Sequence, residues 1–314
     1  MLYLAAMTIQ SPPLPSPCPD PLARAPRIAS PSAHERLHRI PQGLQGAIAA
    51  IISRDIRGLG TTAEQRLTHF PASPLLSLSW FAGYEAGLVE HAGTGPLWRP
   101  FGASVVLAGS QSRPCTSWMP TDGRALMLCF TADIARRLFG VDPADIHDRF
   151  ADARDVLDGQ WRPLLNALLE TQDDTEALAA LERHLAPRWH AHSASALPSL
   201  RRIGRHWVER IALQAREWRR THSPRQVERR VKAYSGRSLR QWQSLVKTEG
   251  VFFAARERYE TGQPVDWAEL AFDEGFADQA HLIRATRRIT GFAPGEFARR
   301  FIEDESFWLY RLWV

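Results

Sequence analysis

Short apolar runs, separated by glycine, proline and small polar residues, follow one another between about residues 39 and 130. Their length and apolar content are typical of β-strands, and glycine-containing turn signals lie between them. The pattern predicts strands at 75–81, 104–108 and 125–130. Several short strands at this spacing are expected to form a small sandwich or barrel.

Beyond residue 130 the apolar positions recur at the spacing of amphipathic helices, and Thr131 is the predicted N-cap of the first one. Two later stripes, within 161–169 and 178–185, are typical of core or of a dimer surface. A homodimer formed through these helices is therefore a hypothesis. Residues 186–199 are predicted to be a linker, because they combine prolines with several small polar residues.

The two ends of the chain differ in composition from the rest. Residues 1–33 hold eight of the 22 prolines and no apolar periodicity, which predicts a disordered tail. Residues 302–314 form an apolar, aromatic tail whose docking place the pattern does not determine. The chain has no run of 18 apolar residues, so we expect no contact with a membrane.

Charge is distributed unevenly over the 314 residues, whose number suggests about two domains. The net charge is +5. Residues 199–301 carry 21 Lys and Arg against 12 Asp and Glu, a net charge of +9, and the remaining residues carry 18 against 22, a net charge of −4. A basic C-terminal third predicts a module that binds a polyanion, with double-stranded DNA as the expected partner.

The sequence offers little for an enzyme. Its three cysteines form no C-x-x-C pair, which favours a reducing compartment and a cytoplasmic location. Metal-binding barrels need several histidines and a carboxylate at one site. His69 and His91 lie far apart, however, and the pair His190 and His192 falls in the predicted linker. Because hydrolase, P-loop and dinucleotide fingerprints are also absent, we expect no catalytic residue, no metal and no cofactor.

The stretch 266–301 predicts a helix–turn–helix unit. A short helix over 267–273 is followed by Gly275, which can adopt the positive φ that a tight turn requires. Phe276 is a candidate core anchor, and Asp278 is the predicted N-cap of a second helix that extends to about residue 290. That helix carries arginines along one side, as expected of a helix that enters a major groove.

The unit occurs twice, at an offset of 55 residues. Each copy has a capped basic helix, a glycine that ends it, and a large aromatic residue six positions after that glycine. Agreement at a single offset predicts two helix–turn–helix units. The corresponding residues are Ser223 and Asp278, Val227 and Leu282, Arg229 and Arg284, Lys232 and Arg287, Gly236 and Gly291, and Trp242 and Phe297.

These residues carry a resemblance to a known family. Residues 274–282 with Arg284, followed by 287–294 and Phe297, resemble the C-terminal signature of AraC/XylS transcription regulators, and 223–238 resemble the first unit of that family. The resemblance implies an all-α DNA-binding domain over 200–301. In it, two helix–turn–helix units joined by a long helix over 239–260 read adjacent major-groove segments.

The chain departs from the family pattern at three places. Thr286 stands where the family usually has a core phenylalanine, and Leu239 replaces a frequent proline. The turn over 219–222 lacks the glycine that the family pattern has there, so a different turn geometry is expected in the first unit.

The N-terminal part, residues 36–190, resembles more loosely the cupin-like sensor domains of the same family. The resemblance therefore implies an α+β chain. Its N-terminal domain is expected to be a small β-barrel with following helices that serves sensing or dimerisation, and its C-terminal domain to be all-α.

The resemblance also assigns residues. Gly275, Phe276, Asp278, Gly291 and Pro294 are expected to shape the helix–turn–helix units. The base-facing positions fall on Arg225, Glu228, Arg229 and Lys232 in the first unit, and on Gln279, Ala280, Ile283, Arg284 and Arg287 in the second.

The function expected from these observations is sequence-specific DNA binding by a transcription regulator, either an activator or a repressor. A small-molecule effector or dimerisation through the N-terminal domain would control it, and RNA polymerase is a plausible partner. A regulator whose N-terminal domain binds a protein and no ligand is the first alternative, and a cupin-type enzyme with a DNA-binding tail is the second. An interior lined by Trp80, Trp98 or Trp118 would favour a ligand, and a filled interior would favour a protein partner.

Overall fold

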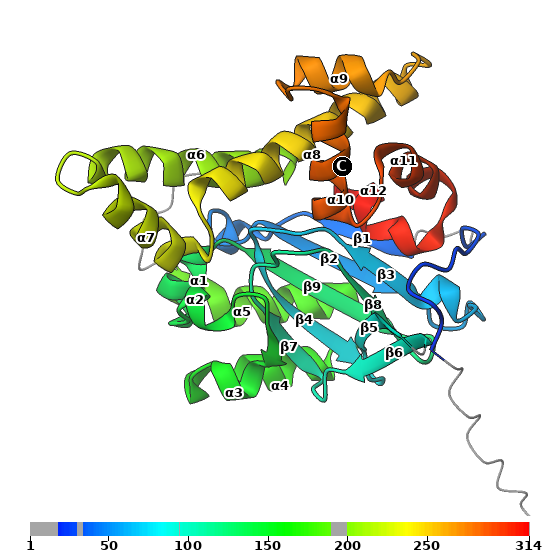
Figure 1. Ribbon diagram of the computed structural model, residues 1–314. Helices are drawn as coiled ribbons and strands as arrows, with labels where there is room; N and C mark the ends of the chain where they lie inside the picture. The colour runs from blue at the N-terminus through cyan, green and yellow to red at the C-terminus, as the bar shows by residue number, and fades with distance from the viewer. Residues whose placement is uncertain (1–17, 30–33, 94, 190–199, 314) are drawn as a thin grey trace, which may run out of the picture.

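Two antiparallel sheets make up the N-terminal half of the chain (Figure 1). The structure is a computed structural model that describes residues 18–29, 34–93, 95–189 and 200–313. The larger sheet has the strand order β1 (Glu35–His38), β2 (Ala50–Asp55), β9 (Arg124–Phe130), β4 (Leu76–Ala82), β7 (Val105–Ala108) and β10 (Phe150–Asp152). The smaller sheet has the order β3 (Leu67–Phe70), β8 (Cys115–Trp118), β5 (Gly87–Ala92) and β6 (Gly95–Pro100).

The predicted strands correspond to β4, β7 and β9. Of the two arrangements that the strand pattern left open, the structure has two sheets, and the small barrel implied by the resemblance is wrong. Within the described residues, no strand of one sheet belongs to the hydrogen-bonded order of the other. The larger sheet is apolar on one face and carries many small residues on the other. Its apolar face packs against helices, while its other face is turned to the smaller sheet, so the domain is an open two-sheet arrangement with one helical layer.

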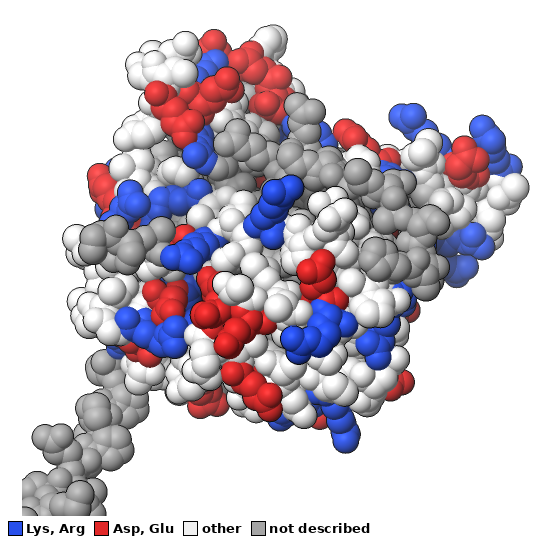
Figure 2. All heavy atoms as spheres, turned by 180° about the vertical axis from the view of Figure 1, so that it is seen from behind, with Lys and Arg blue, Asp and Glu red and all other residues white. Residues whose placement is uncertain are grey.

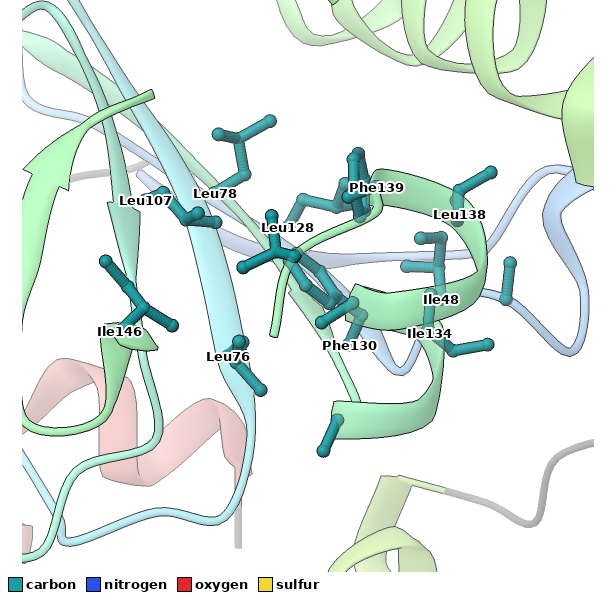
Figure 3. Close-up of a cluster of buried hydrophobic side chains, with 14 of the residues drawn as sticks. Ile48, Leu76, Leu78, Leu107, Leu128, Phe130, Ile134, Leu138, Phe139 and Ile146 are labelled. Atoms are coloured by element: carbon teal, nitrogen blue, oxygen red, sulfur yellow. The ribbon is translucent and has the colours of Figure 1, made fainter. Parts of the chain in front are cut away.

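The main core lies between the larger sheet and its helices. α1 (Ala132–Phe139), α4 (Arg162–Glu170) and α5 (Asp174–Trp189) cover this face, with α2 (Pro143–Ile146) and α3 (Ala153–Val156) at its edge (Figure 1). Figure 3 shows Leu78, Leu128 and Phe130 of the sheet beside Phe139 of α1. The rings of Phe130 and Phe139 are 4.8 Å apart.

The apolar stripes of α4 and α5 are buried in the core of the N-terminal domain. Leu164, Leu165 and Leu168 of α4, and Leu181 and Leu185 of α5, are buried in this core. A dimer through the helices at 161–185 would therefore have to use their outer faces, because the apolar residues are already covered.

The first four residues of the predicted linker, 186–189, are helical. α5 continues to Trp189, although Pro187 lies within it. Trp189 is buried and donates a hydrogen bond from Nε1 to the carbonyl oxygen of Gln45 (3.0 Å). This contact with the N-terminal domain fixes the end of the helix, a long-range effect that a local pattern cannot reveal. Residues 190–199 lie outside the described residues.

The C-terminal part is helical. Its helices are α6 (Leu200–Trp218), α7 (Pro224–Ser235), α8 (Leu239–Glu260), α9 (Trp267–Asp273), α10 (Gln279–Thr290) and α11 (Pro294–Glu303). α8 has the bounds predicted for the joining helix, and α7 and α10 begin where their predicted caps lie. Apolar residues of α6, α7 and α8 belong to the same buried cluster as the larger sheet. The first helical unit is thus packed directly against the N-terminal domain (Figure 1).

The C-terminal tail docks on the N-terminal sheets. A turn of 3-10 helix (Glu305–Phe307) leads into α12 (Trp308–Trp313). Trp308 and Leu309 pack against residues of β2 and β9, and Trp308 Nε1 donates to Thr68 Oγ1 of β3 (2.9 Å). This segment, residues 304–313, is called the clasp below, because it returns from the DNA-binding part to the sheets.

Part of the predicted disordered tail has a defined place in the structure. Residues 18–29 run beside α11 and the clasp, where Pro26 forms an isolated bridge with Asp304 and Ala25 is buried. Arg300 Nη2 donates to the carbonyl oxygen of Leu22 (2.6 Å). The prediction of disorder is wrong for this part, because its contacts use backbone groups and need no apolar periodicity. Residues 1–17 and 30–33 lie outside the described residues.

A helix that is both long enough and apolar enough to cross a bilayer does not occur in the part of the chain that the structure describes.

Candidate DNA interface

Local sequence explains the geometry of the second helical unit. α9 is followed by Gly275, whose φ of +71° lies in the left-handed region, and Phe276 then inserts into the core. Asp278 caps α10, since its Oδ1 accepts a hydrogen bond from the backbone N–H of His281 (2.6 Å). Gly291, with φ of +86°, ends α10, and Pro294 occupies the first turn of α11.

Two faces of α10 have opposite character. Leu282, Ala285 and Ile289 are buried, while Ile283 is half-buried. Four of the predicted base-facing residues are exposed on the other side, namely Gln279, Ala280, Arg284 and Arg287. The helix therefore presents two arginines and an amide to solvent along one side.

Thr286, the departure from the family pattern, is fully buried in α10. Its hydroxyl has no hydrogen-bond partner among the described residues. Position 286 is therefore a core position, as the family pattern implies. Threonine is smaller than the usual phenylalanine and places a polar hydroxyl there.

The first unit also has two helices joined by a short turn, but its turn differs from that of the second unit. α6 ends at Trp218, whose carbonyl oxygen accepts hydrogen bonds from the N–H groups of Thr221 (3.2 Å) and His222 (2.9 Å). Among the described non-glycine residues, only Asp148 has a positive φ. Residues 219–222 therefore all have negative φ, and this turn needs no glycine. Ser223 then caps α7 together with Gln226 in a reciprocal capping box.

α7 also has a buried apolar side and an exposed polar side. Val227 and Val231 are buried, and the four predicted base-facing residues, Arg225, Glu228, Arg229 and Lys232, are exposed. Lys232 Nζ lies 2.9 Å from Glu228 Oε1. An exposed pair of this kind contributes only about 0.3–0.5 kcal/mol, so a phosphate could replace its carboxylate at little cost.

Both α7 and α10 carry arginines that have no acidic partner among the described residues. Within the described residues, Arg225, Arg229, Arg284 and Arg287 form no ion pair with an acidic side chain. Figure 2 shows mostly Lys and Arg, with an acidic group among them, at the end where α6 and α7 meet, and mostly Asp and Glu over the far end of α8 and α9. On the face that Figure 2 shows, basic side chains therefore lie away from α9.

Two further basic residues lie next to the candidate site and contact the protein itself. Arg288 is exposed beside Arg284 and donates to Ser244 Oγ of α8 (3.3 Å). Lys247 of α8 donates to the carbonyl oxygen of Gly275, and its Nζ lies 4.6 Å from the ring centre of Phe276. Lys247 therefore braces the turn of the second unit, a role that only the packing of α8 on α9 and α10 could reveal.

Both candidate reading helices are held at their C-terminal ends by the N-terminal domain. Arg136 of α1 donates to the carbonyl oxygens of Tyr234 (3.2 Å) and Ala233 (3.1 Å) in the last turn of α7. The backbone N–H of Ala72 donates to the carbonyl oxygen of Ile289 in α10 (2.8 Å). Cations and donors at this end satisfy the free carbonyl groups of a helix. A change in the N-terminal domain can therefore reach both helices directly.

A cavity of about 140 Å³ lies between the two sheets. Its lining is mostly apolar and comes from the inner faces of both sheets, with Trp308, Leu309 and Tyr310 of the clasp and Glu249 of α8. The three tryptophans whose presence in the lining would have favoured a ligand, Trp80, Trp98 and Trp118, do not line it. Trp80 points into the helical core on the opposite face, and Trp98 and Trp118 pack edge to face at 5.5 Å.

The described residues offer no chemistry typical of a cupin-type metal enzyme. His69 is buried against Phe292 and Phe307, and burial lowers its pKa to about 3. His91 is exposed on β5. The one cluster of metal-ligand type in the described part comprises His34, Glu35 and Glu305, and its carboxylates face the guanidinium groups of Arg54 and Arg311. Two arginines beside these carboxylates already supply the positive charge that a metal would bring.

Comparisons with known proteins identify regulators only at low similarity. No family model and no curated protein matches the chain. A structure of a variant of ToxT from Vibrio cholerae is 14% identical, covers 74% of this chain and 95% of that chain, and has a TM-score of 0.34. A second ToxT structure is 10% identical, covers 84% and 98%, and has a TM-score of 0.34. The AraC-like transcriptional activator CuxR is 13% identical, covers 73% and 86%, and has a TM-score of 0.27.

Proposed function

We propose that this chain is a sequence-specific DNA-binding transcription regulator of the AraC/XylS type. The carrying observation is the pair of capped helices α7 and α10, which expose arginines without acidic partners. Arginine contacts guanine edges and phosphates with charge-assisted hydrogen bonds, and a helix of this width fits the major groove. We assign base reading to Arg225, Glu228, Arg229 and Lys232, and to Gln279, Ala280, Ile283, Arg284 and Arg287.

The cavity between the sheets supports control by a small molecule. A regulator whose N-terminal domain binds only a protein partner would be expected to have a filled interior, whereas this domain leaves about 140 Å³ empty. The contacts of Arg136 and Ala72 with the ends of α7 and α10 provide a route from that domain to the reading helices. Dimerisation and contact with RNA polymerase remain part of the proposal.

Selection of bound DNA from a random pool, with the full chain, tests DNA reading. On the selected site, Arg284→Ala should cost about 1–3 kcal/mol of binding free energy and relax the preference at one or two base pairs. Arg229→Ala should do the same about ten base pairs away. Arg162→Ala is the matched control, since Arg162 is exposed on α4 and should leave the preference unchanged.

Two further results would decide against this assignment. If Arg284→Ala weakens selected and random DNA by the same factor, Arg284 contacts the backbone and does not read bases. If the chain contacts about 6–10 phosphates, its affinity should fall about 10³-fold or more between 50 and 200 mM salt. An affinity that does not change with salt would contradict DNA binding itself.

A further inference from the structure

One loop of the N-terminal domain lies at the ends of both candidate reading helices. This loop, residues 109–114, joins β7 to β8, and Ser110 Oγ in it lies 2.8 Å from Nδ1 of His147. A β-carbon at Gly236, which ends α7, would lie only 2.7 Å from the same nitrogen, so the ring of His147 lies directly against the end of α7. The end of α7 therefore rests on a side chain that the loop holds.

The end of α10 rests on another part of the same loop. A β-carbon at Gly291, which ends α10, would lie 3.6 Å from Cγ of Pro114. The backbones of Gln111 and Ser73 exchange two hydrogen bonds (2.9 and 3.0 Å), and the neighbouring Ala72 donates to a carbonyl oxygen of α10. Both helices end on the N-terminal half of the chain (Figure 1). The 109–114 loop is thus held between the ends of the two helices.

Arginines of the DNA-binding part meet at this junction. Arg237 follows α7, Arg240 lies in the first turn of α8, and Arg288 lies in the last turn of α10. Burial lowers the pKa of Arg237 and the positive charge of Arg288 lowers it further, while Asp148 of the N-terminal domain acts in the opposite direction. Because such effects require groups that lie close together, the ends of both units bring their charges to one place.

Arg113 of the loop adds a charge of the N-terminal domain to this junction. Its side chain is exposed, and within the described part of the chain it forms no ion pair with an acidic side chain. The last carbonyl groups of a helix carry about half a negative charge, which repels phosphate. A cation between two helix ends offsets this repulsion, so Arg113 lies where DNA bound to both helices needs positive charge.

DNA that contacts both reading helices must pass this junction. A helix of 12 residues is about 18 Å long, whereas the major groove is about 12 Å wide. The ends of α7 and α10 therefore reach the phosphates that border the groove. Two adjacent major-groove segments are separated by one minor-groove segment, and the phosphates of that segment would face the junction between the two helix ends.

We propose that Arg113 of the N-terminal domain contacts the DNA backbone, at a phosphate between the two base patches that α7 and α10 read. The DNA interface then includes both parts of the chain, with Arg237 and Arg240 on the helical side and Arg113 on the loop. This inference rests on the proposed function and adds to it a DNA contact outside the helical domain. A phosphate contact carries no base information, so Arg113 contributes affinity and no sequence preference.

Salt titrations with the full chain test the contact. Arg113→Ala should weaken binding to selected and random DNA by the same factor, about three- to tenfold at about 100 mM salt, and should make the slope of log affinity against log salt less steep by about 1. Arg113→Lys keeps the charge and should keep the slope. Arg162→Ala is the matched control, since Arg162 is also exposed but lies on α4, and it should change neither quantity.

Ethylation interference locates the contact on the DNA. With the unsubstituted chain, ethylation of phosphates between the two base patches should impair binding, and in Arg113→Ala one or two of these phosphates should no longer matter. An unchanged salt slope and interference pattern in Arg113→Ala would overturn the proposal. A higher affinity of Arg113→Ala would also overturn it, because the loop would then hinder DNA. A failure of the proposed function appears already with the unsubstituted chain, whereas a failure of this inference appears only in the variant.

Discussion

The buried pair between Arg54 and Glu305 should be one of the main links between the clasp and the sheets. Both side chains are 1% exposed, and Arg54 Nη2 lies 2.7 Å from Glu305 Oε1. Glu305 also accepts a hydrogen bond from the backbone N–H of Ile28 (3.1 Å) and faces His34 (3.4 Å) and Arg311 (3.7 Å). The substitution Glu305→Gln keeps the shape and one acceptor oxygen but removes the negative charge from this cluster.

The expected cost follows from the burial of the remaining charge. Removing one partner of a buried ion pair typically costs about 3–5 kcal/mol, because the other charge stays in a medium of low polarity. The glutamine oxygen can still accept a hydrogen bond from Arg54, so we expect the lower end, about 3 kcal/mol. Arg54→Met removes the guanidinium and leaves Glu305 with His34 and Arg311, so it should cost somewhat less.

Urea unfolding followed by far-UV circular dichroism measures these losses in the full chain. The double variant Glu305→Gln with Arg54→Met should be more stable than the sum of the single losses predicts, by at least about 2 kcal/mol of coupling free energy. Two results would refute the reasoning, namely a loss below about 1 kcal/mol for Glu305→Gln, or single losses that add within about 0.5 kcal/mol. Either would mean that the apolar contacts of Trp308 and Leu309 hold the clasp without the ion pair.

Three more predictions concern stability. Hydrogen bonds to two glutamates raise the pKa of His34 to about 9. Its contribution is complete below about pH 6.5 and is lost as the pH rises from there through 9, a decline that unfolding curves of His34→Gln should lack. Deletion of residues 1–17 should leave the melting temperature unchanged, whereas deletion of 1–29 should lower it by several degrees, because residues 18–29 bond to α11 and the clasp. Arg136→Met should cost about 1–2 kcal/mol and speed hydrogen exchange at the end of α7, whereas Arg137→Met, at an exposed neighbour, should do neither.

Much of the DNA-binding part follows from local sequence signals. Asp278 caps α10, Ser223 caps α7, and Gly236 and Gly291 end these two helices with positive φ. Each signal acts within a few residues, so it can be recognised without knowledge of the fold. The split of α10 into a buried and an exposed side follows from its period of 3.6 residues in the same way. Whether the exposed residues read bases remains a prediction.

The pairing of the strands could not be predicted from the local sequence pattern. The short strands β1, β3 and β10 have three or four residues each, too few for a clear alternation of apolar and polar positions. A closed barrel and two open sheets share the same short runs and turn signals. The hydrogen-bond order of the strands, together with the helices that cover one face of the larger sheet, decides between them.

The sequence by itself determined the helices of the C-terminal part, their caps and the basic side of α7 and α10. Only the tertiary structure decided the contacts that join the two parts of the chain. Arg54 and Glu305 are 251 positions apart, and residues 18–29 meet a segment about 275 positions later. An isolated arginine in an apolar strand and a proline-rich tail carry no periodic signal. Their roles arise because folding brings buried charges and unpaired backbone groups to partners that are distant in the chain.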